Sequence, residues 1–403
     1  MDADRNRLTV ASWDVASGDL DFVSADGRTA HASLPSRPAD ATSQISRVLL
    51  FPDSFVLGLT TVRNDAVSVL LPFKNGVESA SAPTVYLDQN HWSSIAKLSY
   101  APERIKTAQE ARSASQVKEM AMNGSIVLPL SMAHLGETLK WHAIDSRYQH
   151  GLAMLQLSRG WQFRHPLEIR KEELAASFAS CFEHRQFPRR SAVTLLPDAM
   201  YHLRDYVNLS QSYPADIDDA FRLHCMTAAV VLADLLLDSA PVEDSETVGW
   251  TARMQEFHNW LHQQDLSKKK RNDAIDAFFF SDIVKEISIG AALVNATKVE
   301  LEEWVTERRV HELAKCPALA LFRELIRDKF SNRQAHWEDN DLEDLLYLSC
   351  AASYVDYVVC ESATAGLLRQ AQRRIGEKAT VYRDLGQFVR GATIDPSCQS
   401  YGL

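Results

Sequence analysis

The sequence lacks the cysteine patterns that mark zinc fingers, zinc ribbons and disulfide frameworks. Its cysteines stand at positions 181, 225, 316, 350, 360 and 398, and they include no CxxC pair and no Cys/His grouping with zinc-finger spacing. This spacing excludes a structural zinc site of these classes. We therefore expect reduced, mostly buried thiols.

A long hydrophobic run is also missing. The longest apolar stretch, residues 226–237, is interrupted by Asp234 and is too short to span a bilayer. The first ten residues, MDADRNRLTV, contain no apolar signal core. These absences predict a cytoplasmic protein that has no membrane partner.

Two phosphate-handling motifs are absent as well. The chain has no GxxxxGK[ST] loop, which argues against an ATPase of the P-loop class. Where a phosphoaspartate enzyme would carry a DxD pair after its first strand, this chain has Asp88, Gln89 and Asn90. The net charge of −10 argues against a surface coated with basic residues for non-specific nucleic-acid binding. A local basic groove or a carboxylate-rich metal site remains compatible with that charge.

What is present is the composition of a folded protein, with 46% hydrophobic and 24% charged residues in a chain of 403. Residues 1–80 alternate short apolar runs with turn residues, which predicts a small antiparallel β-rich N-terminal domain. The stretch LPSRPADATS is expected to be an exposed loop within it. The segment NGVESASAP is expected to be a linker.

An α/β pattern follows and is interrupted. Residues 84–150 contain apolar strands TVYL and IVLPL, each followed by helical sequence, and they form the predicted first part of an α/β domain with a central parallel sheet. Residues 151–334 are almost entirely helical in pattern and are interpreted as a large insertion. Residues 335–403 complete the α/β domain with a helix DLEDLLYLSCAASY, a strand DYVVC, a helix SATAGLLRQAQRRIG and a last strand TVYRD.

Four carboxylates occupy equivalent places in this layout: Asp88 and Glu361 directly follow strands, and Glu137 and Asp344 lie early in helices. Asn340 and Glu343 are expected to cap the helix that carries Asp344. Ligands of open parallel sheets bind outside the carboxyl ends of the strands, so all four acids can reach one crevice. Each acid alone has a plainer explanation, such as capping a helix or complementing its dipole.

The chemistry explains why acids would be gathered there. Clustered carboxylates repel one another unless cations occupy the space between them. Mg²⁺ and Mn²⁺ prefer oxygen ligands and retain waters, and two such ions stabilise the attacking and leaving oxygens of phosphodiester cleavage. The pattern therefore predicts a Mg²⁺ or Mn²⁺ site of two ions that hydrolyses phosphodiester bonds.

The motifs resemble those of PIN-like nucleases over residues 85–145 and 335–390. VYLDQNHW resembles the first motif, with Asp88 and Asn90, and IVLPLSMAHLGETLK resembles the second, with Glu137. NDLEDLLYLSCAASYVDYVVCES resembles the third and fourth together. Asp344 is preferred as the helical acid there, and Asp341 is the close alternative.

The sequence departs from the family pattern at three points. Glu361 stands where the family usually has Asp, and Cys360 stands where Thr or Ser is common. The helical insertion is also far larger than a minimal PIN domain carries.

The resemblance implies a PIN-like three-layer sandwich and cleavage of single-stranded or structured RNA ahead of DNA. It implies that Asp88, Glu137, Asp344 and Glu361, with Asp341, bind the metal, and that Asn90 orients Asp88 or a metal-bound water. Many members are toxins of toxin–antitoxin pairs or act in phage defence, so an inhibitory partner protein and a homo-oligomer are both compatible with the resemblance.

Three basic clusters are candidates for contact with nucleic acid. They are Lys268, Lys269, Lys270 and Arg271, expected on a loop of the insertion; Arg185, Arg189 and Arg190 around Phe187; and Arg369, Arg373 and Arg374, expected beside the acids. His134 is expected to support Glu137 from one turn earlier. His91 and Trp92 are interpreted as structural residues, with Trp92 in the core.

Two other functions stay open at this stage. One is a catalytically degenerate PIN-like scaffold that binds RNA or a protein, which the Glu361 substitution and the overall acidity favour. The other is a metal-dependent phosphohydrolase that acts on a nucleotide or a phosphoprotein.

Overall fold

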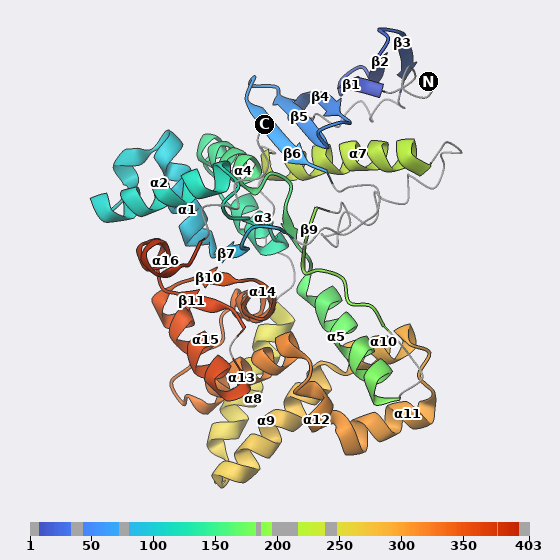
Figure 1. Cartoon of the computed structure of the whole chain (residues 1–403). Coiled ribbons are helices and arrows are strands. Elements are labelled where there is room, and N and C mark those ends of the chain that lie inside the picture. The colour runs from blue at the N-terminus through green and yellow to red at the C-terminus, as the bar shows by residue number, and fades with distance from the viewer. Residues whose placement is uncertain are drawn as a thin grey trace.

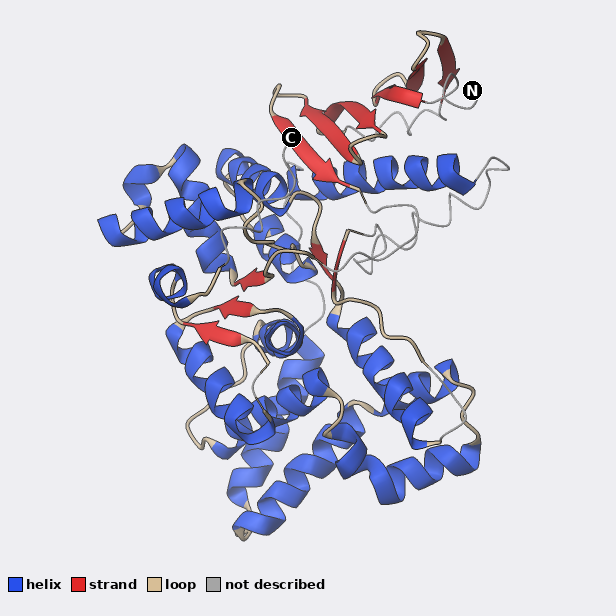
Figure 2. Ribbon diagram, in the orientation of Figure 1, coloured by secondary structure: helices blue, strands red, loops and turns tan. Residues whose placement is uncertain are grey.

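The computed structural model describes residues 8–33, 43–71, 80–182, 187–195, 217–237, 248–376 and 378–394. In these residues the chain is mixed α/β, with an antiparallel sheet, a parallel sheet and many helices (Figures 1 and 2). Most of the loop expected at LPSRPADATS and part of the expected linker lie outside the described residues.

The N-terminal residues form the expected antiparallel unit. Its strands are β1 (Leu8–Asp14), β2 (Asp19–Ser24), β3 (Thr29–Ser33), β4 (Ile45–Phe51), β5 (Val56–Thr61) and β6 (Ala66–Leu70), in the order β3-β2-β1-β4-β5-β6. Alternate side chains of β5 and β6 are buried and the others face outward. This period of two is what a sheet with one covered face requires.

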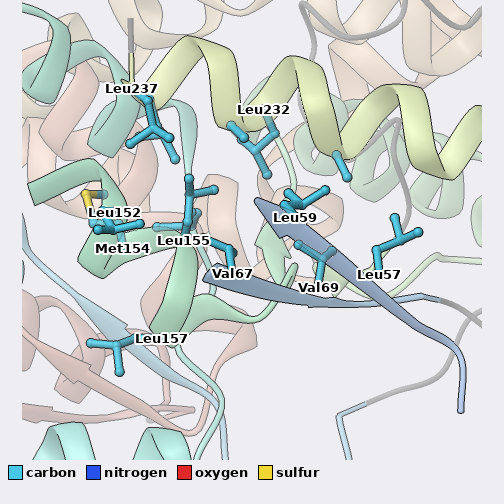
Figure 3. Packing of buried hydrophobic residues seen from close by; sticks show 14 of the residues in the cluster. Leu57, Leu59, Val67, Val69, Leu152, Met154, Leu155, Leu157, Leu232 and Leu237 are labelled. Atoms are coloured by element: carbon cyan, nitrogen blue, oxygen red, sulfur yellow. The ribbon is translucent and has the colours of Figure 1, made fainter. Parts of the chain in front are cut away.

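Helices α4 (Ile144–Ser158) and α7 (Ile217–Leu237) cover the buried face of this sheet (Figure 3). Leu57 and Leu59 of β5 pack with Leu155 of α4 and Leu232 of α7. The charged residue Asp234 is tolerated within the apolar stretch of α7. Its carboxylate accepts hydrogen bonds from the backbone N–H of Gln44 and the hydroxyl of Ser43. None of the described helices is both long and apolar enough to cross a membrane.

The parallel sheet consists of β7 (Val85–Leu87), β10 (Tyr357–Val359) and β11 (Thr380–Tyr382), in the order β11-β10-β7. β10 thus pairs with a strand some 270 positions earlier, with Val358 opposite Tyr86. The strand expected at residues 126–130 is reduced to isolated bridges, in which Val127 pairs with Thr84 and Leu130 pairs with Gln162. Pro129 lacks a backbone N–H and prevents a continuous ladder there.

Helices flank this sheet. They are α1 (Gln89–Tyr100), α2 (Ala108–Met122), α3 (Met132–Leu139), α14 (Asp341–Tyr354), α15 (Ser362–Ile375) and α16 (Leu385–Gly391). The bounds of α14 and α15 agree with the helices predicted from the sequence. Helix α16 was not predicted, because its seven residues are too few for a periodic pattern; Asp384 caps it by accepting from the N–H of Gln387 at 2.8 Å.

The region between the two parts of the parallel sheet is largely helical, as expected. Besides α4 and α7 it contains α5 (Pro166–Cys181), α8 (Val248–Gln263), α9 (Lys268–Asp282), α10 (Val284–Leu293), α11 (Lys298–Glu303), a π-helix (Trp304–Arg308), α12 (Arg309–Leu313) and α13 (Pro317–Ser331). The strands β8 (Gln162–Phe163) and β9 (Val193–Thr194) also lie here.

The prediction that Lys268, Lys269, Lys270 and Arg271 lie on a loop is wrong. These residues form the first turn of α9, because Ser267 accepts a hydrogen bond from the N–H of Lys270 and caps the helix. A run of four basic residues is typical of an exposed loop, but the Ser267 cap allows these residues to begin a helix.

Polar contacts join helices of the insertion to one another and to the α/β part. The buried carboxylate of Glu173 accepts from the N–H groups of Ala318 and Leu319 at the start of α13. Arg374 of α15 pairs with Glu324 and Asp328 of α13. Cys181, Cys225, Cys316, Cys350 and Cys360 are free thiols, and Cys398 lies outside the described residues.

Candidate functional site: a carboxylate cluster at the strand ends

Asp88 and Glu361 lie at the carboxyl ends of neighbouring parallel strands. Asp88 follows β7, whose three residues are buried, and its backbone N–H donates to the carbonyl of Val359 at 2.9 Å. From β7 the chain continues to the bridged segment on one side, whereas β10 lies on the other side. The strand order therefore reverses between β7 and β10, which is where open α/β sheets bind ligands.

The two carboxylates do not serve as helix caps. Asp88 and Glu361 occupy the N-cap positions of α1 and α15, yet neither makes a side-chain cap hydrogen bond. Asp384, at the corresponding place after β11, does cap its helix. The structure therefore does not support the explanation that Asp88 is simply a helix cap. Without a cap hydrogen bond, the carboxylates of Asp88 and Glu361 can make other contacts.

Glu137 reaches the cluster from α3. Ser131 caps this helix as expected: its hydroxyl accepts from the N–H of His134, and Nδ1 of His134 accepts from the N–H of Ser131. Nε2 of the same ring lies 2.7 Å from the carbonyl of Leu87, the residue before Asp88. The side chain of His134 therefore joins the start of α3 to the end of β7.

These contacts assign the tautomer of His134. Nδ1 accepts from a backbone N–H, so Nε2 carries the proton and donates to the Leu87 carbonyl. Burial lowers the pKa of His134 to about 4, and its hydrogen bond to Leu87 opposes the shift. His134 is neutral near pH 7 and positions Glu137 relative to Asp88.

Asp344 enters from the first turns of α14. Asn340 is the N-cap residue of this helix, as expected, but it makes no side-chain cap hydrogen bond, so the capping predicted for Asn340 and Glu343 is wrong at Asn340. Asp341, the alternative ligand, is paired with Lys329. This pairing leaves Asp344 as the better placed of the two helical acids.

Electrostatic coupling shows that the predicted acids are neighbours. Desolvation, together with repulsion from Asp344, Asp88 and Glu343, raises the pKa of Glu137 to about 8. Desolvation and then Asp88, Glu343, Asp341 and Glu361 raise the pKa of Asp344 to about 7. Because the side chain of Asp344 is exposed, solvent screens part of this effect, whereas Glu137 is half-buried and feels more of it.

Asp88 lies at the centre of these interactions. Desolvation raises its pKa, and the nearby Glu361 adds to the shift. His91 and hydrogen bonds from the backbone N–H groups of Gln89 and Glu361 oppose it. The elements β7, β10, α3 and α14 thus bring Glu137, Asp344 and Glu361 within electrostatic reach of Asp88.

Glu343 is a fifth acid that the sequence reasoning did not assign to the site. Its Oε1 would lie 3.7 Å from a Cβ atom added at Gly136, and its charge raises the pKa of both Glu137 and Asp344. The sequence did hold a signal, since Glu343 is adjacent to Asp344. The same position also fits a helix cap with Asn340, which is the role predicted for Glu343.

Asn90 contacts a different acid from the one expected. Its side-chain N–H₂ donates to Oε1 of Glu361 rather than to Asp88. This hydrogen bond joins the first turn of α1 to the residue after β10. It therefore fixes the position of the long glutamate side chain.

The cluster is not a ready-made metal centre. Among the residues that the structure describes, no three His, Cys, Asp or Glu side chains stand in an arrangement that holds a metal ion. The acids are close enough to raise one another's pKa but are not gathered around a point. Separation is what mutual repulsion favours when no cation lies between carboxylates.

Most of the predicted basic residues near the site already have intramolecular partners. Arg369 donates through Nε and Nη2 to the carbonyl of Val381, and Arg374 is paired with α13. Arg373 is exposed on α15. Lys268, Lys269 and Lys270 are exposed as well, and α9 lies at the end of the molecule away from the parallel strands (Figure 1).

The cluster around Phe187 is also engaged in part. Arg190 pairs with Glu172 at 2.7 Å. Arg189 acts on the buried Glu173 and lowers its pKa, although burial raises it overall. Arg185 lies outside the described residues.

No protein-family model, curated protein or solved structure matches this chain. The fold and the site therefore define a class only: an α/β protein with coupled carboxylates at the carboxyl ends of parallel strands.

Proposed function

We propose that this chain is a Mg²⁺- or Mn²⁺-dependent nuclease with a PIN-like arrangement, acting as an endoribonuclease on single-stranded RNA. The convergence of Asp88, Glu137, Asp344 and Glu361 carries the proposal. Two of these acids come from residues 88–137 and two from residues 344–361, and they interact at the switch point of the parallel sheet. This is the grouping that the motif resemblance implies.

The donor set fits a hard cation. All the coupled side chains offer carboxylate oxygens, which Mg²⁺ and Mn²⁺ prefer. Desolvation, and after it repulsion from neighbouring acids, raises the pKa of Glu137 and of Asp344, and a bound cation would favour the ionised form of both. Binding requires these side chains to close in from the positions described above.

Each acid would have a distinct part in holding the ions. Asp88 and Glu361 project from the ends of strands and are the more rigid pair, the latter held by Asn90. Glu137 and Asp344 project from helices and are the pair that moves inward. Two bound metal ions would supply an oriented water and would stabilise the leaving oxygen of the phosphodiester.

The resemblance to PIN-like nucleases also suggests where the protein acts and with which partners. We propose cytoplasmic action on RNA, with an inhibitory partner or a role in phage defence. Among the described basic residues that were predicted to contact nucleic acid, Arg373 and the three lysines of α9 are exposed and can contact phosphate.

Cleavage of a labelled single-stranded RNA in Mn²⁺ tests the proposal. The wild-type protein should cut the oligonucleotide internally, and Asp88→Asn combined with Glu137→Gln should lower the rate at least about a hundredfold. Glu119→Gln, on an exposed face of α2, is the control and should cut normally. Equal rates for wild type and double variant would reject the nuclease.

One alternative has a specific observation behind it. The lack of a ready-made metal arrangement, together with Glu361 in place of Asp, favours a degenerate scaffold that binds RNA without cutting. In that case the wild-type protein would retain RNA in a filter-binding assay and release no product in Mn²⁺. A phosphohydrolase would instead act on a mononucleotide and leave the oligonucleotide intact.

A further inference from the structure

A cleft lined by several residues with polar side chains lies beside the carboxylate cluster, between α1, α2 and α16. Its volume is about 340 Å³, and its lining includes Ser94, Glu110, Ser113, Asp384 and Arg390. Sites for small molecules are typically about 300–1,000 Å³, so the cleft has room for one nucleoside-sized group. None of these five residues was assigned a role from the sequence.

His91 connects the cleft to the acids. It lines the cleft, and its charge interactions involve Asp88, Asp384 and Glu361. Its ring is hydrogen-bonded to the carbonyl of Cys360, and Nε2 is buried without a hydrogen-bond partner among the described residues. A group in the cleft would therefore lie next to whatever the acids bind.

Gly386 keeps the cleft open. A Cβ atom at this position would lie 3.1 Å from Oδ1 of Asp384, 3.2 Å from Nη1 of Arg390 and 3.3 Å from Oγ of Ser113. These polar atoms come from the end of β11, from α16 and from α2, so three elements converge around the missing side chain. Convergent polar groups in a small cleft are typical of a binding site.

The charged side chains that line the cleft indicate which kind of ligand it can bind. The cleft has the carboxylates of Glu110 and Asp384 against the single guanidinium of Arg390, which disfavours a phosphate. Oε1 of Glu110 accepts from the Ser94 hydroxyl, and Oδ1 of Asp384 accepts from the Gln387 N–H. Each carboxylate has a second oxygen, which suits the O–H donors of a ribose or the N–H donors of a base.

We propose that this cleft binds one nucleoside of the substrate, through its sugar hydroxyls and base edge, beside the phosphodiester held at the carboxylate cluster. The inference rests on the proposed nuclease function for the identity of its ligand. The binding itself is independent of cleavage and is tested separately.

The test compares Gly386→Ala with Gly249→Ala. Both glycines are the second residue of a helix, but a Cβ atom at Gly249 meets nothing within 4 Å. Saturation-transfer NMR with adenosine, guanosine, cytidine and uridine should show that the wild type and Gly249→Ala bind at least one of them. Gly386→Ala should weaken that binding at least about tenfold, because the added methyl group overfills the cleft.

Cleavage kinetics on labelled RNA provide the second arm. Gly386→Ala should raise KM at least about tenfold with little change in kcat. The nucleoside contact that it weakens contributes equally to binding of the substrate and of the transition state. Ser113→Ala removes one polar atom without filling the cleft. It should weaken nucleoside binding in the same direction even where Gly386→Ala does not fold.

The outcomes separate the two proposals. Nucleoside binding by a wild-type protein that cuts no RNA would support the cleft and reject the nuclease. RNA cleavage by a protein that binds no nucleoside, with Gly386→Ala kinetics equal to wild type, would reject the cleft and support the nuclease. Inorganic phosphate displacing the nucleoside from the cleft would also overturn the inference.

Discussion

Glu137 is a site carboxylate whose ionisation is strongly opposed by its surroundings. Its pKa of about 8 lies well above its ordinary value of 4.5, so the folded protein binds the proton more tightly than the unfolded chain does. The stabilisation from this proton is complete below about pH 4.5 and is lost as the pH rises through 8. The side chain thus makes the metal-free protein less stable in alkaline solution.

Replacement of Glu137 by Gln tests this residue directly. The amide is neutral at every pH, so the melting temperature of metal-free Glu137→Gln should fall less between pH 5 and pH 8 than that of the wild type. At pH 8 the variant should melt a few degrees higher. Calorimetry at fixed ionic strength measures both, and Glu119→Gln serves as the matched control. Equal slopes for Glu137→Gln and wild type would show that Glu137 is not held in its protonated form.

At the residue scale, the sequence suggests which residues to consider but not which partners they contact. Asp88, Glu137, Asp344 and Glu361 were selected because order and spacing along the chain are visible in sequence. The donation from Asn90 to Glu361 and the pairing of Asp341 with Lys329 depend on how distant segments meet. No spacing rule reports such contacts.

Helix packing in this molecule depends on glycine at two positions. A Cβ atom at Gly151 of α4 would lie 2.5 Å from the carbonyl oxygen of Leu236 in α7. At Gly290 of α10 it would lie 2.6 Å from Cβ of Leu174 in α5. Both helix pairs therefore approach more closely than any other residue allows.

Alanine at these glycines should separate the helices. Gly151→Ala and Gly290→Ala should each lower the free energy of unfolding by about 1–3 kcal/mol, the usual cost of overpacking. Gly366→Ala in α15, where a Cβ atom meets nothing within 4 Å, should raise it by about 0.5–1 kcal/mol. Urea denaturation measures all three. A change of the same sign in every variant would show that backbone entropy, and not contact, governs these positions.

At the element scale, length and periodicity decided what could be predicted. Helices α14 and α15 have clear apolar patterns, and their predicted bounds agree with the structure. Helix α16 is short, and the segment at residues 126–130 looks like a strand because its side chains are apolar, although Pro129 limits its pairing. Burial produces the same apolar run in a strand and in a buried extended loop.

At the scale of the whole molecule, the fold partly buries the site acids near one another and so opposes their ionisation, which a bound cation would favour. At pH 8 Mn²⁺ should therefore raise the melting temperature of the wild type, since ligands that bind only the folded state stabilise it by about 2.7 kcal/mol at a hundred times Kd. The rise should be smaller at pH 5, where Glu137 and Asp344 are protonated and protons compete with the metal. Asp88→Asn/Glu137→Gln should show little rise at either pH. Equal stabilisation of wild type and double variant would place the metal elsewhere.

The overall architecture was predictable in outline. The antiparallel unit, the interrupted α/β pattern and the long helical stretch all have periodic signatures in sequence. The packing of the N-terminal sheet against α4 and α7 was not predicted, because it joins residues near 57 to residues near 232. Contacts over such separations leave no local pattern in a single sequence.

The pairing of β7 with β10 has a consequence for synthesis of the protein. The two halves of the carboxylate cluster are separated by some 200 residues of chain, so a ribosome must synthesise and release this whole stretch before Asp88 and Glu361 can meet. A nascent polypeptide that displays Asp88 and Glu137 alone has half a site. If the chain cuts RNA, its own messenger and the ribosome translating it are exposed to an inert protein until Glu361 has been synthesised and released.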